Sequence, residues 1–129
     1  MHAGGSAAKD AILYVIDADA SAREALCRLA VAARFGTKGF ASIETFVEES
    51  WPHAGGCVLL DSSLLHVGGQ FRSTMRRRGL DWPVIVLCAS DDERARREAR
   101  AFGAHFLLNK PVDAQALFDA IAWVTEEQG

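Results

Sequence analysis

The sequence predicts an α/β fold in which a doubly wound parallel sheet of five strands is covered by five helices. Five short apolar runs alternate with segments whose apolar residues recur at helical spacing. Most runs are apolar at nearly every position, which is typical of strands covered on both faces. Because strand-helix-strand connections are right-handed, the order βαβαβαβαβα leads to a doubly wound sheet.

The first half of the chain carries the signals for three strands and two helices. Strands are expected over 11–16, 37–40 and 57–60, of which the second is the weakest run. Ser21 and Glu24 form a capping box that predicts the start of the first helix, and this helix ends before Gly36. Ser42 is the expected cap of the second helix.

The second half predicts two strands and three helices. The strands lie at 84–88 and 106–108. A helix over 70–78 stops at Gly79, a fourth runs from Asp92 to Phe102, and Asp113 caps the last. On the fourth helix the residues expected to face outward are Arg94, Arg96, Arg97, Glu98 and Arg100. On the last, the inward stripe is Leu117, Phe118, Ile121 and Val124.

Composition limits the class of protein. The 129 residues, half of them hydrophobic, suffice for one core, so residues 10–129 are predicted to be a single domain after a disordered leader over 1–9. The net charge of −3 argues against direct nucleic-acid binding. No run reaches the roughly 18 apolar residues of a membrane span. The cysteines, Cys27, Cys57 and Cys88, are expected to be reduced and buried, so a cytoplasmic protein is predicted.

Charged residues gather where the expected strands end. Asp17 and Asp19 follow the first strand, Asp61 follows the third, and Lys110 follows the fifth. Each acid taken singly is as readily a helix cap or a turn residue. Together they favour a charged site, because ligands of such sheets bind at the carboxyl ends of the strands. Pro111 after the lysine predicts a cis peptide bond that turns Lys110 inward.

Several segments match one known pattern. They are Val15-Ile-Asp-Ala-Asp19 with Arg23-Glu-Ala-Leu26, Leu59-Leu-Asp61 with Gly68-Gly69, Pro83-Val-Ile-Val-Leu-Cys-Ala89, Gly103-Ala104 and Asn109-Lys-Pro111. From about residue 11 to 125 the chain thereby resembles the receiver domain of bacterial two-component response regulators. The resemblance implies a flavodoxin-like (βα)5 fold with strand order 2-1-3-4-5.

The resemblance also implies a function. Asp61 is then the aspartate that accepts a phosphoryl group from a histidine kinase or phosphotransfer protein, and Lys110 pairs with that group. Asp17, Asp61 and the backbone carbonyl of Ser63 are the implied ligands of Mg²⁺. A divalent cation and a lysine can neutralise the charge on the transferred oxygens. The protein is expected to signal to an effector protein and not to be an enzyme, apart from slow self-catalysed phosphorylation and dephosphorylation.

Three positions depart from the family pattern. Ala18 stands where a second acidic metal ligand is usual, so a lower affinity for Mg²⁺ is expected. Cys88 occupies the position of the switch threonine or serine, and Leu107 that of the switch aromatic residue. A thiol is a weaker donor than a hydroxyl, so phosphorylation is expected to couple poorly to the surface.

Asp19 has two interpretations. Residues two apart on an extended strand share a face, so Asp19 is a candidate metal ligand beside Asp17. The alternative, which we favour, is that Asp19 turns to solvent or assists the start of the next helix, where aspartate is common.

Two other functions are alternatives. The departures also suit a pseudo-receiver, which would act as a docking or dimerisation module without phosphorylation. Asp17-Ala-Asp19 resembles the D-x-D motif of haloacid-dehalogenase-type phosphatases. In this chain, however, the acidic pair Asp91-Asp92 precedes Lys110 and there is no room for the usual cap, so the phosphatase is the less favoured alternative.

A partner surface is expected where the fourth helix, fifth strand and fifth helix meet. Trp123 lies a quarter-turn or more from the inward stripe and is predicted to be partly exposed. Arginines of the fourth helix and acids such as Asp119 and Glu126 would form a polar rim around it. We expect a homodimer, or a docking site for a kinase or effector, unless Trp123 folds back on its own domain. We expect no output domain after residue 129, so an effect on transcription would need a separate partner.

Overall fold

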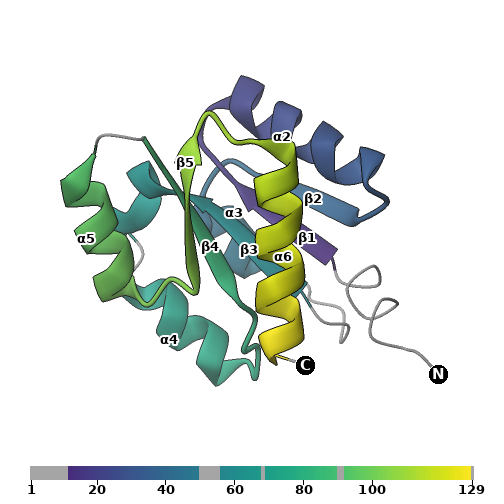
Figure 1. The fold of residues 1–129 in the computed structure, drawn as a ribbon. Coiled ribbons are helices and arrows are strands. Elements are labelled where there is room, and N and C mark those ends of the chain that lie inside the picture. Colours follow the sequence, from purple (N-terminus) through teal and green to yellow (C-terminus); the bar gives the residue numbers. More distant parts are fainter. Residues whose placement is uncertain (1–11, 50–55, 68, 90–91, 129) are drawn as a thin grey trace.

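The fold is a single five-stranded parallel sheet, seen in a computed structural model that describes residues 12–49, 56–67, 69–89 and 92–128 (Figure 1). The strands are β1 (Ile12–Ile16), β2 (Gly36–Phe40), β3 (Gly56–Asp61), β4 (Val84–Ala89) and β5 (Phe106–Lys110). Their order is β2-β1-β3-β4-β5 and all pairs are parallel. The predicted fold class and strand order are confirmed, whereas the predicted leader over 1–9 lies outside the described residues.

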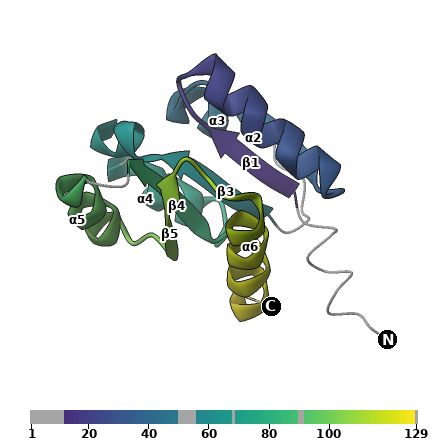
Figure 2. The ribbon, with the colours of Figure 1, turned by 45° about the horizontal axis from the view of Figure 1, so that its top comes forward.

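Helices cover both faces of the sheet (Figures 1 and 2). One face carries α2 (Ala20–Ala32) and α6 (Ala114–Gln128). The other carries α3 (Ile43–Glu48), α4 (Gly69–Arg77) and α5 (Glu93–Phe102), and a short 3-10 helix, η1 (Ser62–Val67), follows β3. Within the described ranges, no helix combines the length and the apolar character that crossing a membrane requires.

The strands feed two cores, which explains their nearly continuous apolar sequence. Along β1, Tyr14 and Ile16 pack toward α3, α4 and α5, while Leu13 and Val15 pack toward α2 and α6. Every residue of the central strand β3 is buried. The edge strand β2 has only Phe40 fully buried, and this is why its sequence signal is weak.

The helix starts test the capping predictions. The capping box at Ser21 is wrong, because the N-cap of α2 lies two residues earlier, at Asp19, which accepts a hydrogen bond from the Ser21 amide at 3.2 Å. The Asp19 carboxylate accepts the hydrogen bond of the Ser21 amide, so Ser21 lies inside the first turn of the helix and is not its cap. Ser42 and Asp113 accept from the amides of Thr45 and Ala116, as predicted, and Asp92 likewise caps α5 by accepting from the Ala95 amide.

The cysteines are unpaired thiols, but they differ in burial. Cys57 and Cys88 are buried as predicted. Cys27 is only half-buried, because it lies at the margin of the core between the sheet and α2. Burial raises the pKa of Cys57 to about 12, so this thiol stays protonated and unreactive at neutral pH.

Candidate functional site

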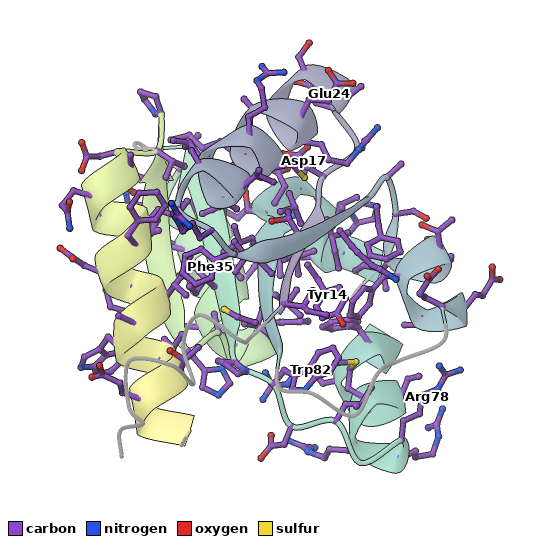
Figure 3. All side chains as sticks on the ribbon, turned by 90° about the vertical axis from the view of Figure 1, so that its right-hand side faces the viewer. Tyr14, Asp17, Glu24, Phe35, Arg78 and Trp82 are labelled. Carbon is purple, nitrogen blue, oxygen red and sulfur yellow. The ribbon has the colours of Figure 1, made fainter. Side chains whose placement is uncertain are left out.

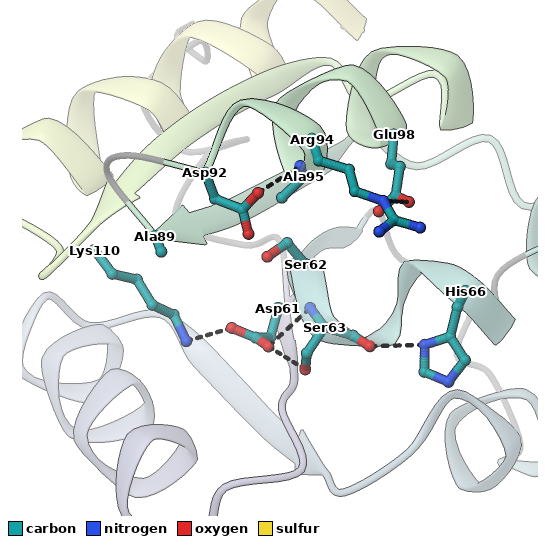
Figure 4. A pocket seen from close by; sticks show the side chains of 10 residues that line it. All are labelled: Asp61, Ser62, Ser63, His66, Ala89, Asp92, Arg94, Ala95, Glu98 and Lys110. Carbon is teal, nitrogen blue, oxygen red and sulfur yellow. Dashed lines mark hydrogen bonds and ion pairs between the residues drawn. The ribbon is translucent and has the colours of Figure 1, made fainter.

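Asp17, Asp61 and Lys110 converge at the carboxyl edge of the sheet, as predicted. The register of β1 and β3 ends at the pair Ile16 and Leu60, so Asp17 and Asp61 stand side by side just beyond it. The Lys110 ammonium donates to Oδ1 of Asp61 (Figure 4). It also lies 3.4 Å from Oδ2 of Asp17. The Lys110–Pro111 peptide bond is cis, which confirms a further prediction.

One lysine balances two carboxylates here. Asp17 and Asp61 are 3% and 8% exposed, and they are the buried charged residues of the described ranges. Burial alone would raise the pKa of Asp61, but hydrogen bonds from Lys110 and Ser63 and the charge of Lys110 outweigh it and hold that pKa below its usual value. Burial opposes the charge of Lys110 as well, yet Asp61 and then Asp17 raise the pKa of the lysine. The pair of Asp61 and Lys110 is therefore ionised at neutral pH.

Ser63 orients the second oxygen of Asp61. Its backbone N–H donates to Oδ2 at 3.1 Å, and its hydroxyl donates to the same atom. The Ser63 carbonyl lies 2.8 Å from Nδ1 of His66. A carbonyl only accepts, so Nδ1 carries the proton of that imidazole. The sequence pattern does not single out His66, and its spacing of three from Ser63 in η1 is the one available signal.

The oxygen donors at this edge suit a hard cation such as Mg²⁺. Asp17 and Asp61 place two carboxylates side by side beyond β1 and β3, and Mg²⁺ prefers oxygen ligands. No group of three His, Cys, Asp or Glu side chains with metal-binding geometry occurs in the part of the chain that the structure describes. Asp19 is exposed and engaged as the cap of α2, and Ala18 contributes no donor. The donor set fits Mg²⁺ with one carboxylate fewer than the family pattern.

Cys88 is the next-to-last residue of β4 and belongs to the core between the sheet and α5. It is 1% exposed, and burial raises the pKa of its thiol, although a hydrogen bond with the Ser62 side chain and the charge of Arg96 oppose the rise. The thiol is therefore neutral at neutral pH. Leu107 packs against the same core without an aromatic ring.

A pocket of about 500 Å³ opens beside Asp61 (Figure 4). It is lined by Asp61, Ser62, Ser63, His66, Ala89, Asp92, Arg94, Ala95, Glu98 and Lys110. Arg94 and Glu98 form an ion pair at 3.4 Å on its wall, which comes from α5. The sequence pattern marked these two residues only as an outward, solvated face.

The orientation predicted for Arg96 is wrong. Its side chain is 20% exposed and folds back toward the sheet, where Nη2 donates to Oδ1 of Asn109 at 2.5 Å. Helical spacing alone placed Arg96 outward with the other arginines. An amide acceptor on the neighbouring strand β5, distant in sequence, holds it inward.

Known proteins are similar to this chain in sequence and architecture. The model of the response regulator receiver domain matches residues 13–122. The chain is 32% identical over 110 residues to the transcriptional regulatory protein TdiR of Thauera aromatica, covering 84% of this chain and 48% of that one. It is 28% identical over 110 residues to the transcriptional regulatory protein FixJ of Azorhizobium caulinodans, covering 84% and 52%. The chain thus spans about half the length of these curated relatives.

Solved structures agree. A response regulator receiver protein from Burkholderia phymatum superposes with a TM-score of 0.72 at 26% identity, covering 90% of this chain and 95% of that one. Full-length FixJ from B. japonicum superposes with a TM-score of 0.76 at 26% identity, covering 91% and 58%. With Asp17, Asp61 and Lys110 assembled at the carboxyl edge of this sheet, the chain belongs to the response regulator receiver domain family.

Proposed function

We propose that Asp61 accepts a phosphoryl group from a histidine kinase or a phosphotransfer protein, and that the chain then signals through contacts with an effector protein. Receiver domains are signalling domains of two-component systems, and phosphorylation and Mg²⁺ binding are general in the family. The observation that supports the proposal is an ionised Asp61 carboxylate, paired with Lys110, in the wall of an open pocket. The proposal includes a cytoplasmic location, where thiols stay reduced.

The chain's own residues can carry the transfer. A carboxylate oxygen of Asp61 attacks phosphorus, the bond from phosphorus to the donor's nitrogen breaks, and the electron pair leaves on that nitrogen. The lowered pKa of Asp61 keeps the carboxylate ionised for the attack. Lys110 supplies positive charge beside the transferring oxygens, and the Ser63 amide fixes the carboxylate.

Asp17, Asp61 and the Ser63 carbonyl are the residues that would hold Mg²⁺. When bound, the ion adds positive charge where the phosphoryl oxygens carry negative charge. Because Ala18 supplies no carboxylate, we propose a weaker site than one with a full acid pair.

Intact-mass measurement tests the proposal. The native protein, mixed with acetyl phosphate and Mg²⁺, is expected to gain the mass of one phosphoryl group. Asp61→Asn should gain none, while Asp119→Asn on the exposed face of α6 serves as the control and should behave as native. An adduct that persists in Asp61→Asn would assign the modification to another residue. No adduct on the native protein would favour the pseudo-receiver instead, for which the buried Cys88 is the supporting observation.

We also propose a second copy of this chain as the partner of the surface formed by α5, β5 and α6. Trp123 is 51% exposed and lies edge-on to Phe106, with the ring centroids 5.7 Å apart. A shallow groove of about 400 Å³ runs between β5 and α6 at these two rings. Exposed arginines on α5 and exposed acids on α6 provide the two charges that a twofold pairing would bring together.

A further inference from the structure

Arg96 is held differently from the other arginines of α5. Its guanidinium donates to the amide oxygen of Asn109 at 2.5 Å, and its side chain is 20% exposed. Arg94, two residues earlier, is 83% exposed and pairs with Glu98 on the same helix. The contact between Arg96 and Asn109 therefore ties α5 to β5, whereas the Arg94 pair ties α5 only to itself.

The tie is made next to the phosphorylation site. Asn109 directly precedes Lys110, whose ammonium pairs with Asp61 and Asp17. Across the sheet Asn109 is the register partner of Cys88, and Lys110 that of Ala89. Because β5 is an edge strand with β4 as its one neighbour, α5 is a second support for the strand end that carries Lys110.

Cys88 and Leu107 lack the hydroxyl group and the aromatic ring that the family pattern has at these two positions. Cys88 presents a buried, neutral thiol, which is a weak hydrogen-bond donor. Leu107 has no polar atom and no ring. Arg96, by contrast, lies near enough to Cys88 for its charge to act on the thiol, which also senses Asp61.

We propose that the contact between Arg96 and Asn109 is the route by which the state of Asp61 reaches α5. This inference rests on the proposed function of Asp61. A phosphoryl group brings about −1.5 to −2 charges, which draw the Lys110 ammonium from its present pairing toward the new oxygens. One peptide bond joins Asn109 to Lys110, so the Asn109 amide shifts with the lysine and its bond to Arg96 loosens. By linkage, a partner that binds α5 with this bond broken favours phosphorylation in turn.

Hydrogen exchange of the α5 backbone, followed by mass spectrometry, tests the route. In the native protein, acetyl phosphate and Mg²⁺ are expected to raise the exchange rate across α5 several-fold. Arg96→Gln and Asn109→Ala should exchange fast without the donor and show no further rise. Arg28→Gln, which removes an exposed arginine from α2 on the opposite face of the sheet, is the control and should respond as native.

The outcomes separate this route from the proposed function. If an adduct forms but α5 does not respond, or responds equally in Arg96→Gln, the route is overturned while phosphorylation stands. If no adduct forms, the proposed function fails. Asp61→Asn then tests the route by itself, because it removes the carboxylate that pairs with Lys110. Asp61→Asn should then speed α5 exchange in the native background and not in the Arg96→Gln background. Equal acceleration in both would overturn the route.

Discussion

At the scale of single residues, the chemistry of the site depends on the small number of charged side chains at the carboxyl edge of the sheet. Among the residues that the structure describes, Lys110 is the cation that pairs with both buried carboxylates, and Ala18 supplies no carboxylate beside Asp17. Asp19 does not replace it, because its oxygen satisfies the first free amide of α2. A weaker metal site is the consequence that we propose.

Restoring the missing acid with Ala18→Asp is expected to raise the affinity for Mg²⁺ on the order of tenfold. A unit charge about 4 Å away contributes about 4 kcal/mol at an effective dielectric constant of about 20, and dehydration of the ion offsets much of this. Titration calorimetry with Mg²⁺ measures the change. Asp19→Asn, which keeps a capping side chain, is the control and should leave the affinity unaltered. An unchanged affinity in Ala18→Asp would show that position 18 does not face the ion.

At the scale of elements, the edge strand β5 needs more support than the central strands. At its start, the His105 amide donates to the Val84 carbonyl at 2.8 Å, and Nδ1 of His105 accepts from the Val84 amide at 3.1 Å. The ring thus extends the ladder between β4 and β5 by one hydrogen bond. Burial, and then the charge of Arg72, lower the pKa of His105.

This histidine makes stability depend on pH. Above its usual pKa of about 6.5 the imidazole is neutral in both the folded and the unfolded state. As the pH falls through that value, the unfolded chain binds a proton more readily, so the free energy of unfolding decreases until the pH passes the lowered folded-state pKa. His105→Asn keeps an acceptor but does not titrate. Urea unfolding at about pH 7.5 and about pH 5.5 should show a smaller loss for His105→Asn than for the native protein, and equal losses would contradict the assignment.

The start of β3 is packed too closely for any side chain at position 56. A Cβ on Gly56 would lie 2.8 Å from Cδ2 of Trp82 and 2.9 Å from Cε2 of Tyr14, whose rings stack at 4.9 Å (Figure 3). Both rings pack against the core, so moving either one away from position 56 would cost free energy.

Gly56→Ala is therefore expected to cost about 1–3 kcal/mol of the free energy of unfolding, the usual range for overpacking. Gly36→Ala, on the edge strand β2, is the matched control, because its Cβ would meet Ile12 Cγ1 at 3.6 Å, an ordinary contact. Its effect should stay within about 0.5 kcal/mol. Chemical denaturation compares the two variants, and equal effects would refute the packing argument.

At the scale of the whole molecule, chemistry and contacts occupy neighbouring regions. The pocket beside Asp61 is lined by Lys110 at the end of β5, and the groove at Trp123 is lined by Phe106 at the start of the same strand (Figure 1). A partner on α5 and β5 would therefore contact the strand whose Lys110 pairs with Asp61. The oligomeric state of the protein tests whether this surface binds a second copy of the chain.

Sedimentation is expected to show a dimer of the native protein at high concentration. Trp123→Ala removes the apolar centre and Arg97→Glu reverses a charge of the rim, so both should shift the protein toward the monomer. Arg28→Glu, a charge reversal on the exposed face of α2, is the control and should leave the dimer intact. A native protein that stays monomeric would eliminate the homodimer and leave a different protein as the partner of this surface.

The sequence by itself determined the strand positions, the fold class and the convergence of Asp17, Asp61 and Lys110. A strand buried on both faces must be apolar at every position, and the residue that ends it must lie at the carboxyl edge, so local pattern suffices. Tertiary structure alone decided the inward turn of Arg96 onto Asn109, and it brought the local pairs Ser63–His66 and Arg94–Glu98 to the same pocket as Asp61. A long side chain on a helix surface has several orientations of similar energy, and the choice among them depends on an acceptor that folding brings near.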